Sequence, residues 1–281
     1  MTKSAAVIND LSGFGKCSLT AAIAVLSVMG IQPCPLPTAI LTNQTGYENH
    51  YCYDFSEHMP FYTGMWLKNN ARFDGIYSGY IAGERQVDFI KDFIKTFRKT
   101  DTKIIVDPVM GDNGQLYPAY NKTTCDKIKE LAKTADIITP NLTELCILAG
   151  EDFNSVIEKS DSDFFFEHIE KVARNAIFHD DMKIAVTGIK KDSYIYNGVF
   201  EKGNAQFFRS KEYGSSFSGT GDIFSSIICG SILNDITLSA AVENATEFIE
   251  AVIKETIKEP YEKNHGIDFE KYLYKLAQHR K

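Results

Sequence analysis

Short runs of β-branched residues alternate with amphipathic helical stretches along almost the whole chain, and this alternation restricts the possible folds more than any other feature. Strands that alternate with helices form parallel βαβ units, which stack in layers. The sequence therefore predicts an α/β fold, a three-layer α/β/α sandwich with a central, mostly parallel sheet. The predicted strands are residues 5–10, 74–78, 103–109, 135–141 and 183–188, and the predicted helices are 18–30, 87–99 and 238–258.

The pattern changes between residues 192 and 210. Residues 193–200 and 205–210 are predicted to form an antiparallel hairpin, because a glycine-containing turn at 201–204 separates them. After residue 222 the rest of the chain is predicted to be helical. No long linker, internal repeat or low-complexity segment is visible. We therefore expect residues 1–281 to form a single domain with a small edge hairpin or lid loops.

Composition argues against several classes of function. The chain carries 30 Lys and Arg against 37 Asp and Glu, whereas nucleic-acid partners recruit basic surfaces. Its longest apolar run, residues 19–31, is too short to span a bilayer. The N-terminus turns polar after six residues, and no cysteine pair has C-x-x-C or zinc-site spacing. We expect a reduced, cytoplasmic protein that binds neither nucleic acid nor a membrane.

Small polar residues follow four of the predicted strands. They are Asn9-Asp10, Asp107, Asn141 and Thr187-Gly188. In open α/β sheets, ligands bind beyond the carboxyl ends of the strands. The sequence therefore predicts a ligand site at one edge of the sheet.

The stretch SGTGD, residues 218–222, precedes an apolar helix. Gly219 and Gly221 lack side chains, so the backbone N–H groups around them can approach a ligand closely. The amide groups and the dipole of a helix start favour an anion. Asp222 adds a base at the edge of that anion site. This combination suits a reaction in which a hydroxyl group is deprotonated beside a phosphate group.

Residues 106–117 (VDPVMGDNGQLY) place Asp107 and Asp112 on either side of a turn. These carboxylates hold a hard cation beside a phosphate, or they merely support the turn through their own backbone bonds. Asn141 and Glu144 are three positions apart at a helix start, which favours a capping box. The two roles are compatible, since a capping Glu144 can also face a water molecule on magnesium.

Residues 41–51 (LTNQTGYENHY) follow a proline-rich strand. Thr45, Gly46 and Tyr47 either shape a pocket for a planar ligand or belong to an ordinary loop. The first turn, residues 12–18 (SGFGKCS), lacks the spacing of a P-loop and of a dinucleotide fingerprint. We expect this turn to lie beside the substrate.

Four motifs in this order, VDPVMGD, ADIITPNLTEL, VTG and GTGD, resemble the ribokinase-like superfamily of small-molecule kinases. Thr45-Gly46-Tyr47 and Gly79-Tyr80 are similar to motifs of its pyridoxal (vitamin B6) kinase branch. The resemblance extends from about residue 5 to 258. It implies ATP-dependent phosphorylation of the 5′-hydroxymethyl group of pyridoxal, pyridoxine or pyridoxamine by a homodimer. A requirement for a monovalent cation stays open.

The resemblance also implies roles for individual residues. Asp222 is similar to the catalytic base, and Gly219, Thr220 and Gly221 are similar to the anion hole for the transferred phosphoryl group. The substrate ring would be contacted by Asp10, Thr45 and Tyr80. The region of ATP, its phosphates and Mg²⁺ would be lined by Asp107, Asp112, Thr139, Asn141, Glu144 and Thr187, with Asp107 and Glu144 nearest the metal ion.

One residue departs from the family pattern, because Asp10 stands where well-known B6 kinases often carry a serine. Two alternatives share the reaction type: a hydroxymethylpyrimidine kinase, and another ribokinase-like kinase acting on a sugar or nucleoside. A third alternative, of another class, is a non-catalytic protein that binds B6 or a nucleotide.

Overall fold

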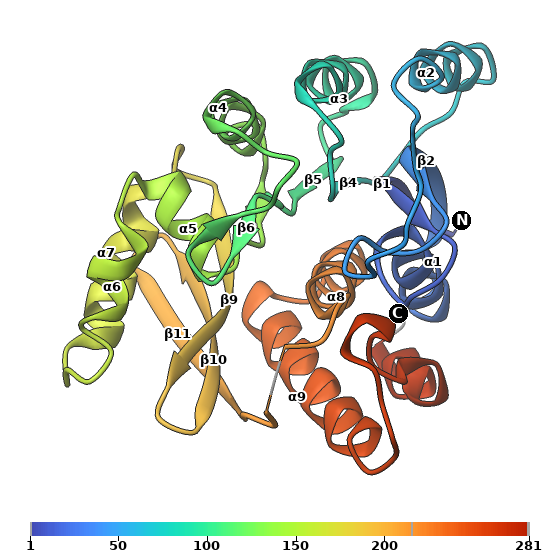
Figure 1. Ribbon diagram of the computed structural model, residues 1–281. Coiled ribbons are helices and arrows are strands. Elements are labelled where there is room, and N and C mark those ends of the chain that lie inside the picture. The colour runs from blue at the N-terminus through green and yellow to red at the C-terminus, as the bar shows by residue number, and fades with distance from the viewer. Residues whose placement is uncertain (1, 215, 280–281) are drawn as a thin grey trace.

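The computed structural model describes residues 2–214 and 216–279 and contains one large sheet (Figure 1). Its strand order is β11-β10-β9-β8-β5-β4-β1-β2-β3, and the six strands from β2 to β9 in this order are parallel. Strand β3 is antiparallel at one edge, and the β10–β11 hairpin is antiparallel at the other. The strands are β1 (Ser4–Ser12), β2 (Gln32–Leu41), β3 (Cys52–Asp54), β4 (Gly75–Ser78), β5 (Lys103–Val106), β8 (Ile137–Ile138), β9 (Lys183–Lys191), β10 (Tyr194–Glu201) and β11 (Asn204–Lys211), with a separate small hairpin of β6 (Gly111–Asp112) and β7 (Gln115–Leu116).

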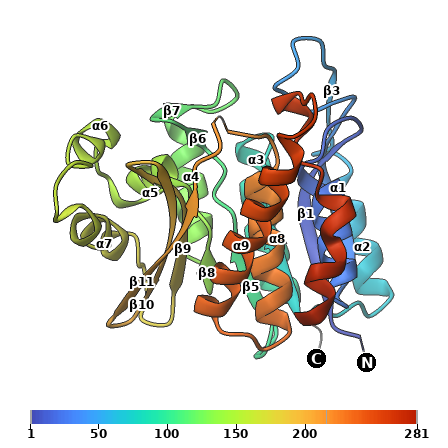
Figure 2. The ribbon, with the colours of Figure 1, turned by 90° about the horizontal axis from the view of Figure 1, so that it is seen from below.

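Helices cover both faces of the sheet (Figures 1 and 2). One face carries α1 (Ser18–Val28), α8 (Thr220–Leu233), α9 (Leu238–Thr256) and the 3₁₀ segment η2 (Phe269–His279). The other carries α2 (Met59–Lys68), α3 (Glu84–Phe97), α4 (Lys122–Ala132), α5 (Leu142–Ala149), α6 (Phe153–Ile157) and α7 (Phe165–Asn175). The predicted three-layer α/β/α sandwich and the edge hairpin are confirmed.

The central strands are buried on both sides, which explains their nearly continuous apolar sequences. In β1, Ala6 and Ile8 join the core under α3 and α4, while Ala5 and Val7 join the core under α1 and α8. Side chains of a strand alternate between the two faces of a sheet. Strand β1 therefore connects both layers of helices and holds the polar residues at its end in a fixed position.

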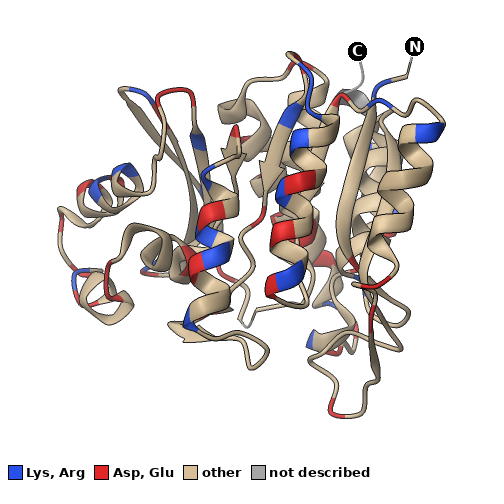
Figure 3. Cartoon of the chain, turned by 90° about the horizontal axis from the view of Figure 1, so that it is seen from above, with Lys and Arg blue, Asp and Glu red and all other residues tan. Residues whose placement is uncertain are grey.

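Charged side chains of both signs are mixed along α3 and α4 (Figure 3). The hydrophobic stripe of α3 is buried, with Ile90 and Phe93 almost fully covered. Its remaining positions are polar or charged, as expected for a surface helix. In the part of the chain that is described, no helix is both long and apolar enough to cross a membrane.

The chain changes direction between β1 and β4. Strand β2 pairs with one side of β1, and β4, the origin of the following βαβ units, pairs with the other side. Ligands of open α/β sheets bind at such a switch point, outside the carboxyl ends of the strands. The register of β1 against β2 shifts between Asn9 and Leu11. A shift of this kind re-aims a side chain, and the residue within it is Asp10.

The C-terminal segment differs from the prediction. Helix α9 ends at Thr256, and residues 259–268 contain only one short 3₁₀ turn, η1 (Lys263–His265). Pro260 cannot continue a helix, and Gly266 has a φ of 91°, which helical residues do not adopt. The predicted strand at 135–141 is also shorter, because only residues 137 and 138 pair with the neighbouring strands before Pro140.

Candidate active site

Asp222 lies in the first turn of α8, beside the end of β1. The side-chain amide of Asn9 donates a hydrogen bond to its carboxylate, with 3.0 Å between Nδ2 and Oδ1. Burial raises the pKa of Asp222 to about 6, although the backbone N–H of Ser18 and the amide of Asn9 both favour the charged form. The carboxylate is therefore mostly ionised at neutral pH, yet close enough to neutrality to accept a proton.

Asn9 organises the centre of the site. In addition to its bond with Asp222, its Oδ1 atom accepts the backbone N–H of Tyr80 at 2.8 Å and that of Asp10 at 2.9 Å. A Cβ atom on Gly79 would lie 2.4 Å from Nδ2 of Asn9. The glycine before Tyr80 is therefore required because the Asn9 side chain occupies the space beside it.

The two glycines of SGTGD serve different purposes. Gly219 has a φ of 80°, and a Cβ atom there would lie 2.0 Å from the carbonyl oxygen of Lys16. Gly221 is exposed, and a Cβ atom there would meet nothing within 4 Å. Helix α8 has no side-chain cap, so the N–H groups from Thr220 to Asp222 remain available to an anion. Gly219 allows close packing of the protein, whereas Gly221 leaves free space in front of those N–H groups.

Asp107 directly follows β5 and is almost fully buried. The hydroxyl of Ser225 donates a hydrogen bond to its Oδ2 atom at 3.1 Å, and the Ser225 and Thr139 hydroxyls are 2.7 Å apart. Burial, with the charges of Glu144 and Asp222, raises the pKa of Asp107 well above its ordinary range. The structure thus brings together Asp107 and Thr139 from neighbouring strand ends, beside α8.

Asn141 and Glu144 form the predicted capping box of α5. The Asn141 side chain accepts the N–H of Glu144 at 3.0 Å, and the Glu144 carboxylate accepts the N–H of Asn141 at 2.9 Å. The other oxygen of Glu144 accepts the N–H of Met110 at 3.0 Å. Burial raises the pKa of Glu144 to about 8 despite these bonds. Thr187 of β9 forms a parallel bridge with Asn141, so these two residues lie side by side.

Asp112 is the outermost acidic residue of this region. Its two carboxylate oxygens accept the backbone N–H and side-chain amide of Asn113, at 2.9 and 2.8 Å. Both bonds support the β6–β7 turn, which is the structural alternative left open by the sequence. Asp112 is nevertheless close enough to raise the pKa of Glu144.

The donor set fits a hard cation that is shared with phosphate groups. Asp107 and Glu144 are buried carboxylates that repel each other, and carboxylate oxygens are the ligands Mg²⁺ prefers. Among the residues described, no three His, Cys, Asp or Glu side chains form a group that could hold a metal ion. A cation here would thus take its remaining ligands from water and from phosphate oxygens, as Mg²⁺ usually does.

The predicted substrate residues come from β1 and from the segments that follow its two neighbours, β4 and β2. Asp10 is buried and accepts the hydroxyl of Ser12 at 2.8 Å, and its burial raises its pKa. Tyr80 follows β4, and burial raises the pKa of its hydroxyl to about 12, with contributions from Cys52 and Asp10. Thr45 is exposed on a loop whose position depends on the buried Gln44, which accepts the N–H of Gly46 at 2.7 Å.

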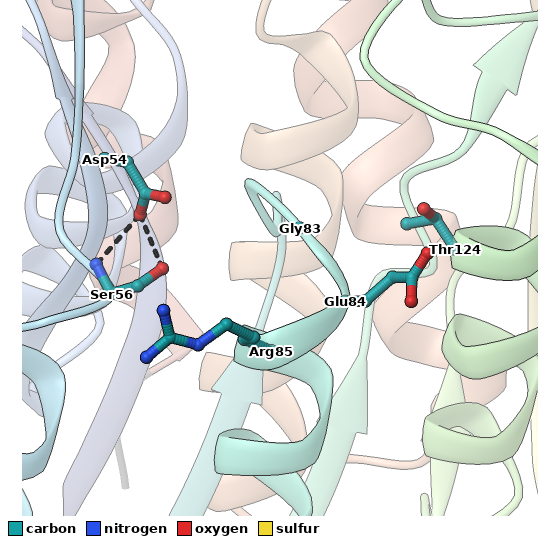
Figure 4. A pocket seen from close by; sticks show the side chains of 6 residues that line it. All are labelled: Asp54, Ser56, Gly83, Glu84, Arg85 and Thr124. Carbon is teal, nitrogen blue, oxygen red and sulfur yellow. Dashed lines mark hydrogen bonds between the residues drawn. The ribbon is translucent and has the colours of Figure 1, made fainter.

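A cavity of about 320 Å³ lies outside this group of residues, between the end of β3 and the starts of α3 and α4 (Figure 4). Asp54, Ser56 and Arg85, which line it, already have partners within the protein. Asp54 accepts the N–H and hydroxyl of Ser56, at 2.8 and 2.5 Å, and Arg85 forms an ion pair with Glu57 at 2.9 Å. None of the residues that the sequence predicts for the site lines this cavity, so it is not a part of the candidate active site.

Several residues that organise the site were not predicted individually. Asn9 was noted only as a polar strand end, and Ser18, Gln44 and Ser225 gave no signal. Ser18 has a φ of 52° at the start of α1, an unusual conformation for a residue other than glycine. Its N–H favours the charged form of Asp222 and its hydroxyl that of Asp10. Such contacts join segments far apart in the chain, which local patterns do not reveal.

Comparison with known proteins shows to which family the chain belongs. The family model described as phosphomethylpyrimidine kinase matches residues 14–267. The chain belongs to the phosphomethylpyrimidine kinase family. A candidate phosphomethylpyrimidine kinase from Bacteroides thetaiotaomicron has a crystal structure that is 36% identical, with a TM-score of 0.91 over 98% of this chain and 94% of that one. A second crystal form of that protein, with a TM-score of 0.89, contains pyridoxal.

Two further relatives of the chain are named pyridoxal kinase. The protein from Dictyostelium discoideum is 24% identical over 273 residues, which are 92% of this chain and 88% of its own. The protein from Leishmania donovani, in complex with ADP and pyridoxamine, shares the fold at 20% identity, with a TM-score of 0.82 over 99% and 96% of the two chains. The predicted resemblance to a ribokinase-like kinase is confirmed.

Proposed function

We propose that this protein is an ATP-dependent kinase that phosphorylates the 5′-hydroxymethyl group of a B6 vitamer: pyridoxal, pyridoxine or pyridoxamine. The observation that carries the proposal is the position of Asp222, which lies between the uncapped start of α8 and the polar end of β1. A base beside free N–H groups is what transfer of a phosphoryl group to an alcohol requires. Family membership and the pyridoxal bound to the Bacteroides relative support the choice of substrate.

In this proposal Asp222 accepts the proton of the substrate hydroxyl. Asn9 and the N–H of Ser18 keep the carboxylate charged and fix its orientation. A general base positioned in this way contributes roughly 10²- to 10⁴-fold to the rate. The proton leaves the alcohol as its oxygen attacks the γ-phosphorus of ATP and the bond to the β-phosphate oxygen breaks.

The N–H groups of residues 219–222 stabilise the charge that collects on the equatorial oxygens of the transferred group. No Lys or Arg is required at that position, because a helix start supplies fixed partial positive charges. Mg²⁺, as part of MgATP, neutralises the phosphates. We assign Asp107 and Glu144 to hold this ion through water or directly, with Asp112, Thr139, Asn141 and Thr187 around the triphosphate.

On the substrate side, Asp10, Thr45 and Tyr80 are proposed to contact the ring. The buried Asp10 would accept a hydrogen bond from a protonated ring nitrogen or another donor on the ring. This assignment explains why a chain with a carboxylate at that position still suits a heteroaromatic alcohol. The departure from serine then concerns which vitamer is preferred, not whether the ring binds.

Hydroxymethylpyrimidine is the second candidate substrate, because the family that matches the chain is named after its phosphate. Turnover with saturating MgATP decides between the candidates, using pyridoxal, pyridoxine, pyridoxamine, hydroxymethylpyrimidine, ribose and adenosine, with the product confirmed by mass. We expect the highest kcat/KM for a B6 vitamer. Turnover of the pyrimidine, the sugar or the nucleoside alone would contradict the substrate assignment. Binding of a vitamer without ATP consumption would support a non-catalytic binding protein.

We also propose a cytoplasmic homodimer. Helix α2 exposes Phe61 and Met65, and the neighbouring edge strand β3 exposes Tyr53. Large apolar side chains that gather on one surface commonly mark an interface. Sedimentation velocity at micromolar concentration tests the dimer, and a single species with the mass of one chain would contradict it.

A further inference from the structure

The segment that joins α9 to η2 lies against three loops of the proposed site. We call residues 259–268 the strap. Ile267, near its C-terminal end, and Phe269, the first residue of η2, are buried in the core beside α1 and α9. The backbone N–H of Asp268 donates to the hydroxyl of Thr256 at 3.0 Å. Figure 2 shows the C-terminal segment in red beside α1. The strap is therefore anchored at its far end, and its middle is held against the site.

The middle of the strap holds the loop that carries Thr45. The side chain of Asn264 donates a hydrogen bond to the carbonyl oxygen of Gly46 at 3.0 Å. In return, Nε2 of Gln44 donates to the carbonyl oxygen of Asn264 at 2.8 Å. A Cβ atom on Gly46 would lie 2.6 Å from Oδ1 of Asn264. The loop and the strap therefore fit together closely from both directions.

The same segment supports the start of α8 and the first turn. The carbonyl oxygen of Lys263 accepts the N–H of Ser218 at 3.1 Å, and that of His265 accepts the N–H of Lys16 at 3.0 Å. A Cβ atom on Gly266 would lie 3.1 Å from the carbonyl oxygen of Ser218 and 3.2 Å from that of Lys16. The strap thus contacts the residue directly before the anion hole.

Charge and aromatic contacts close this junction. The ammonium group of Lys16 forms ion pairs with Asp268 and, at 3.0 Å, with Glu270. The ring of Phe14, from the first turn, lies 5.1 Å from that of His265 and 5.4 Å from that of Tyr47. Three segments that are far apart in the sequence therefore meet at the strap, and each of them belongs to the proposed site.

Resting on the kinase function proposed above, we infer that the strap belongs to the substrate-binding machinery and that Asn264 is a positioning residue for the loop 44–47. Asn264 acts through Gly46 and not on the reacting atoms. When its hydrogen bond is lost, the loop that carries Thr45 is free to move away from the ring of the alcohol substrate. Both of these hydrogen bonds of Asn264 go to the loop 44–47 and not to the proposed triphosphate region around Glu144, so ATP binding is expected to be unaffected.

Steady-state kinetics of two variants test this role. Asn264→Ala removes the side chain, and Asn264→Asp keeps its size but removes the N–H donor. For both variants we expect KM for the alcohol to rise about fivefold, the effect of losing one ordinary hydrogen bond, while kcat and KM for ATP change less than twofold. Asn175→Ala, an exposed asparagine at the end of α7, is the matched control and should behave like the wild type. Unchanged KM in both variants, or a loss of kcat alone, would overturn the inference.

Amide hydrogen exchange provides a readout that does not depend on the substrate. In Asn264→Ala, exchange in a peptide spanning residues 42–50 should become faster, while exchange in residues 103–110 stays unchanged. Equal acceleration in both peptides would show general destabilisation and overturn the positioning role. If exchange in residues 42–50 becomes faster in Asn264→Ala but the wild type turns over none of the tested alcohols, the proposed function is contradicted and the role of the strap is still supported.

Discussion

The two glycines of SGTGD are alike in sequence but differ in what surrounds them. Gly219 is restricted by its φ of 80° and by the nearby carbonyl of Lys16, whereas a Cβ atom on Gly221 would enter open space. A substitution at Gly221, but not at Gly219, can therefore fill the space proposed for the phosphoryl group without disturbing the folded protein.

We predict that Gly221→Ala lowers kcat by about 10²-fold, because an added methyl group in front of the free N–H groups misplaces the phosphoryl group. The melting temperature should stay the same or rise, since alanine favours a helix more than glycine does. Gly219→Ala is the comparison: it should lower both kcat and the melting temperature. Wild-type kcat in Gly221→Ala would show that the start of α8 does not contact the transferred group.

Asp222→Asn is expected to lower kcat/KM at least 10²-fold while leaving the Kd for ATP within about twofold, because the base is lost but the anion site is retained. In the wild type, kcat/KM should fall as pH decreases through about 6, the raised pKa of this carboxylate. The measurement is a pH profile of kcat/KM for the wild type and the Kd for ATP of the variant. Retention of more than a tenth of wild-type turnover would contradict the role of Asp222.

The residues proposed to perform chemistry were easier to single out from the sequence than those that position them. SGTGD and the capping box are visible because their parts are neighbours in the sequence. The contact between Asn9 and Asp222 joins residues 213 positions apart, and that between Ser225 and Asp107 joins residues 118 apart. Such contacts depend on the strand order, which an alternation of strands and helices does not specify.

At the scale of single elements, α5 shows how one residue serves two purposes. Glu144 accepts the N–H groups of Asn141 and Met110 and also lies in the acidic group with Asp107. The sequence offered capping and metal binding as compatible roles. The structure confirms the capping box, and the metal role stays a prediction.

We predict that Glu144→Gln raises the Mg²⁺ concentration required for half-maximal activity about tenfold or more, as changes around a metal site commonly do. At pH 4 or below, where the Glu144 carboxyl group is protonated in both the folded and the unfolded state, it should also destabilise the protein by about 1 kcal/mol, because the NH₂ group of Gln cannot accept a backbone N–H. Mg²⁺ titrations and thermal unfolding measure the two effects. Glu158→Gln, on an exposed residue, serves as the control, and an unchanged Mg²⁺ requirement in Glu144→Gln would contradict the metal role.

Long, strongly periodic elements and most of the short strands matched their predictions, whereas the strand at 135–141 and the segment after α9 did not. Helix α3 and the β10–β11 hairpin follow directly from their patterns. Strand β2 carries prolines at 33, 35 and 37 and still pairs with β1. Alternate residues of a strand face the same side, so the three positions without an N–H donor all face the open side of β2 and no hydrogen bond to β1 is lost. The strap was missed because its position depends on contacts with three other loops.

For the whole molecule, the switch between β1 and β4 concentrates acidic groups at one edge of the sheet. Asp10, Asp107, Glu144 and Asp222 all have a raised pKa, and burial is the largest cause for each. A carboxyl group with a raised pKa in the folded state binds protons more tightly there than in the unfolded state. The folded protein is therefore destabilised as pH rises through the interval between the two values.

The linkage predicts how Asp222→Asn changes global stability with pH. The folded pKa is about 6 and the ordinary value is 3.8, so below about pH 4 the carboxyl is protonated in both states and the variant should match the wild type. Between pH 4 and 6 the wild type loses stability and the variant does not, and above pH 6 the difference becomes constant. At 1.36 kcal/mol for each pKa unit, the free energy of unfolding of the variant exceeds that of the wild type by up to about 3 kcal/mol above pH 6. The difference is smaller if water reaches the carboxylate. Unfolding of both proteins in urea at pH 4, 5, 6 and 8 measures this difference in stability. A difference that does not grow from pH 4 to 6 would contradict the burial of this charge.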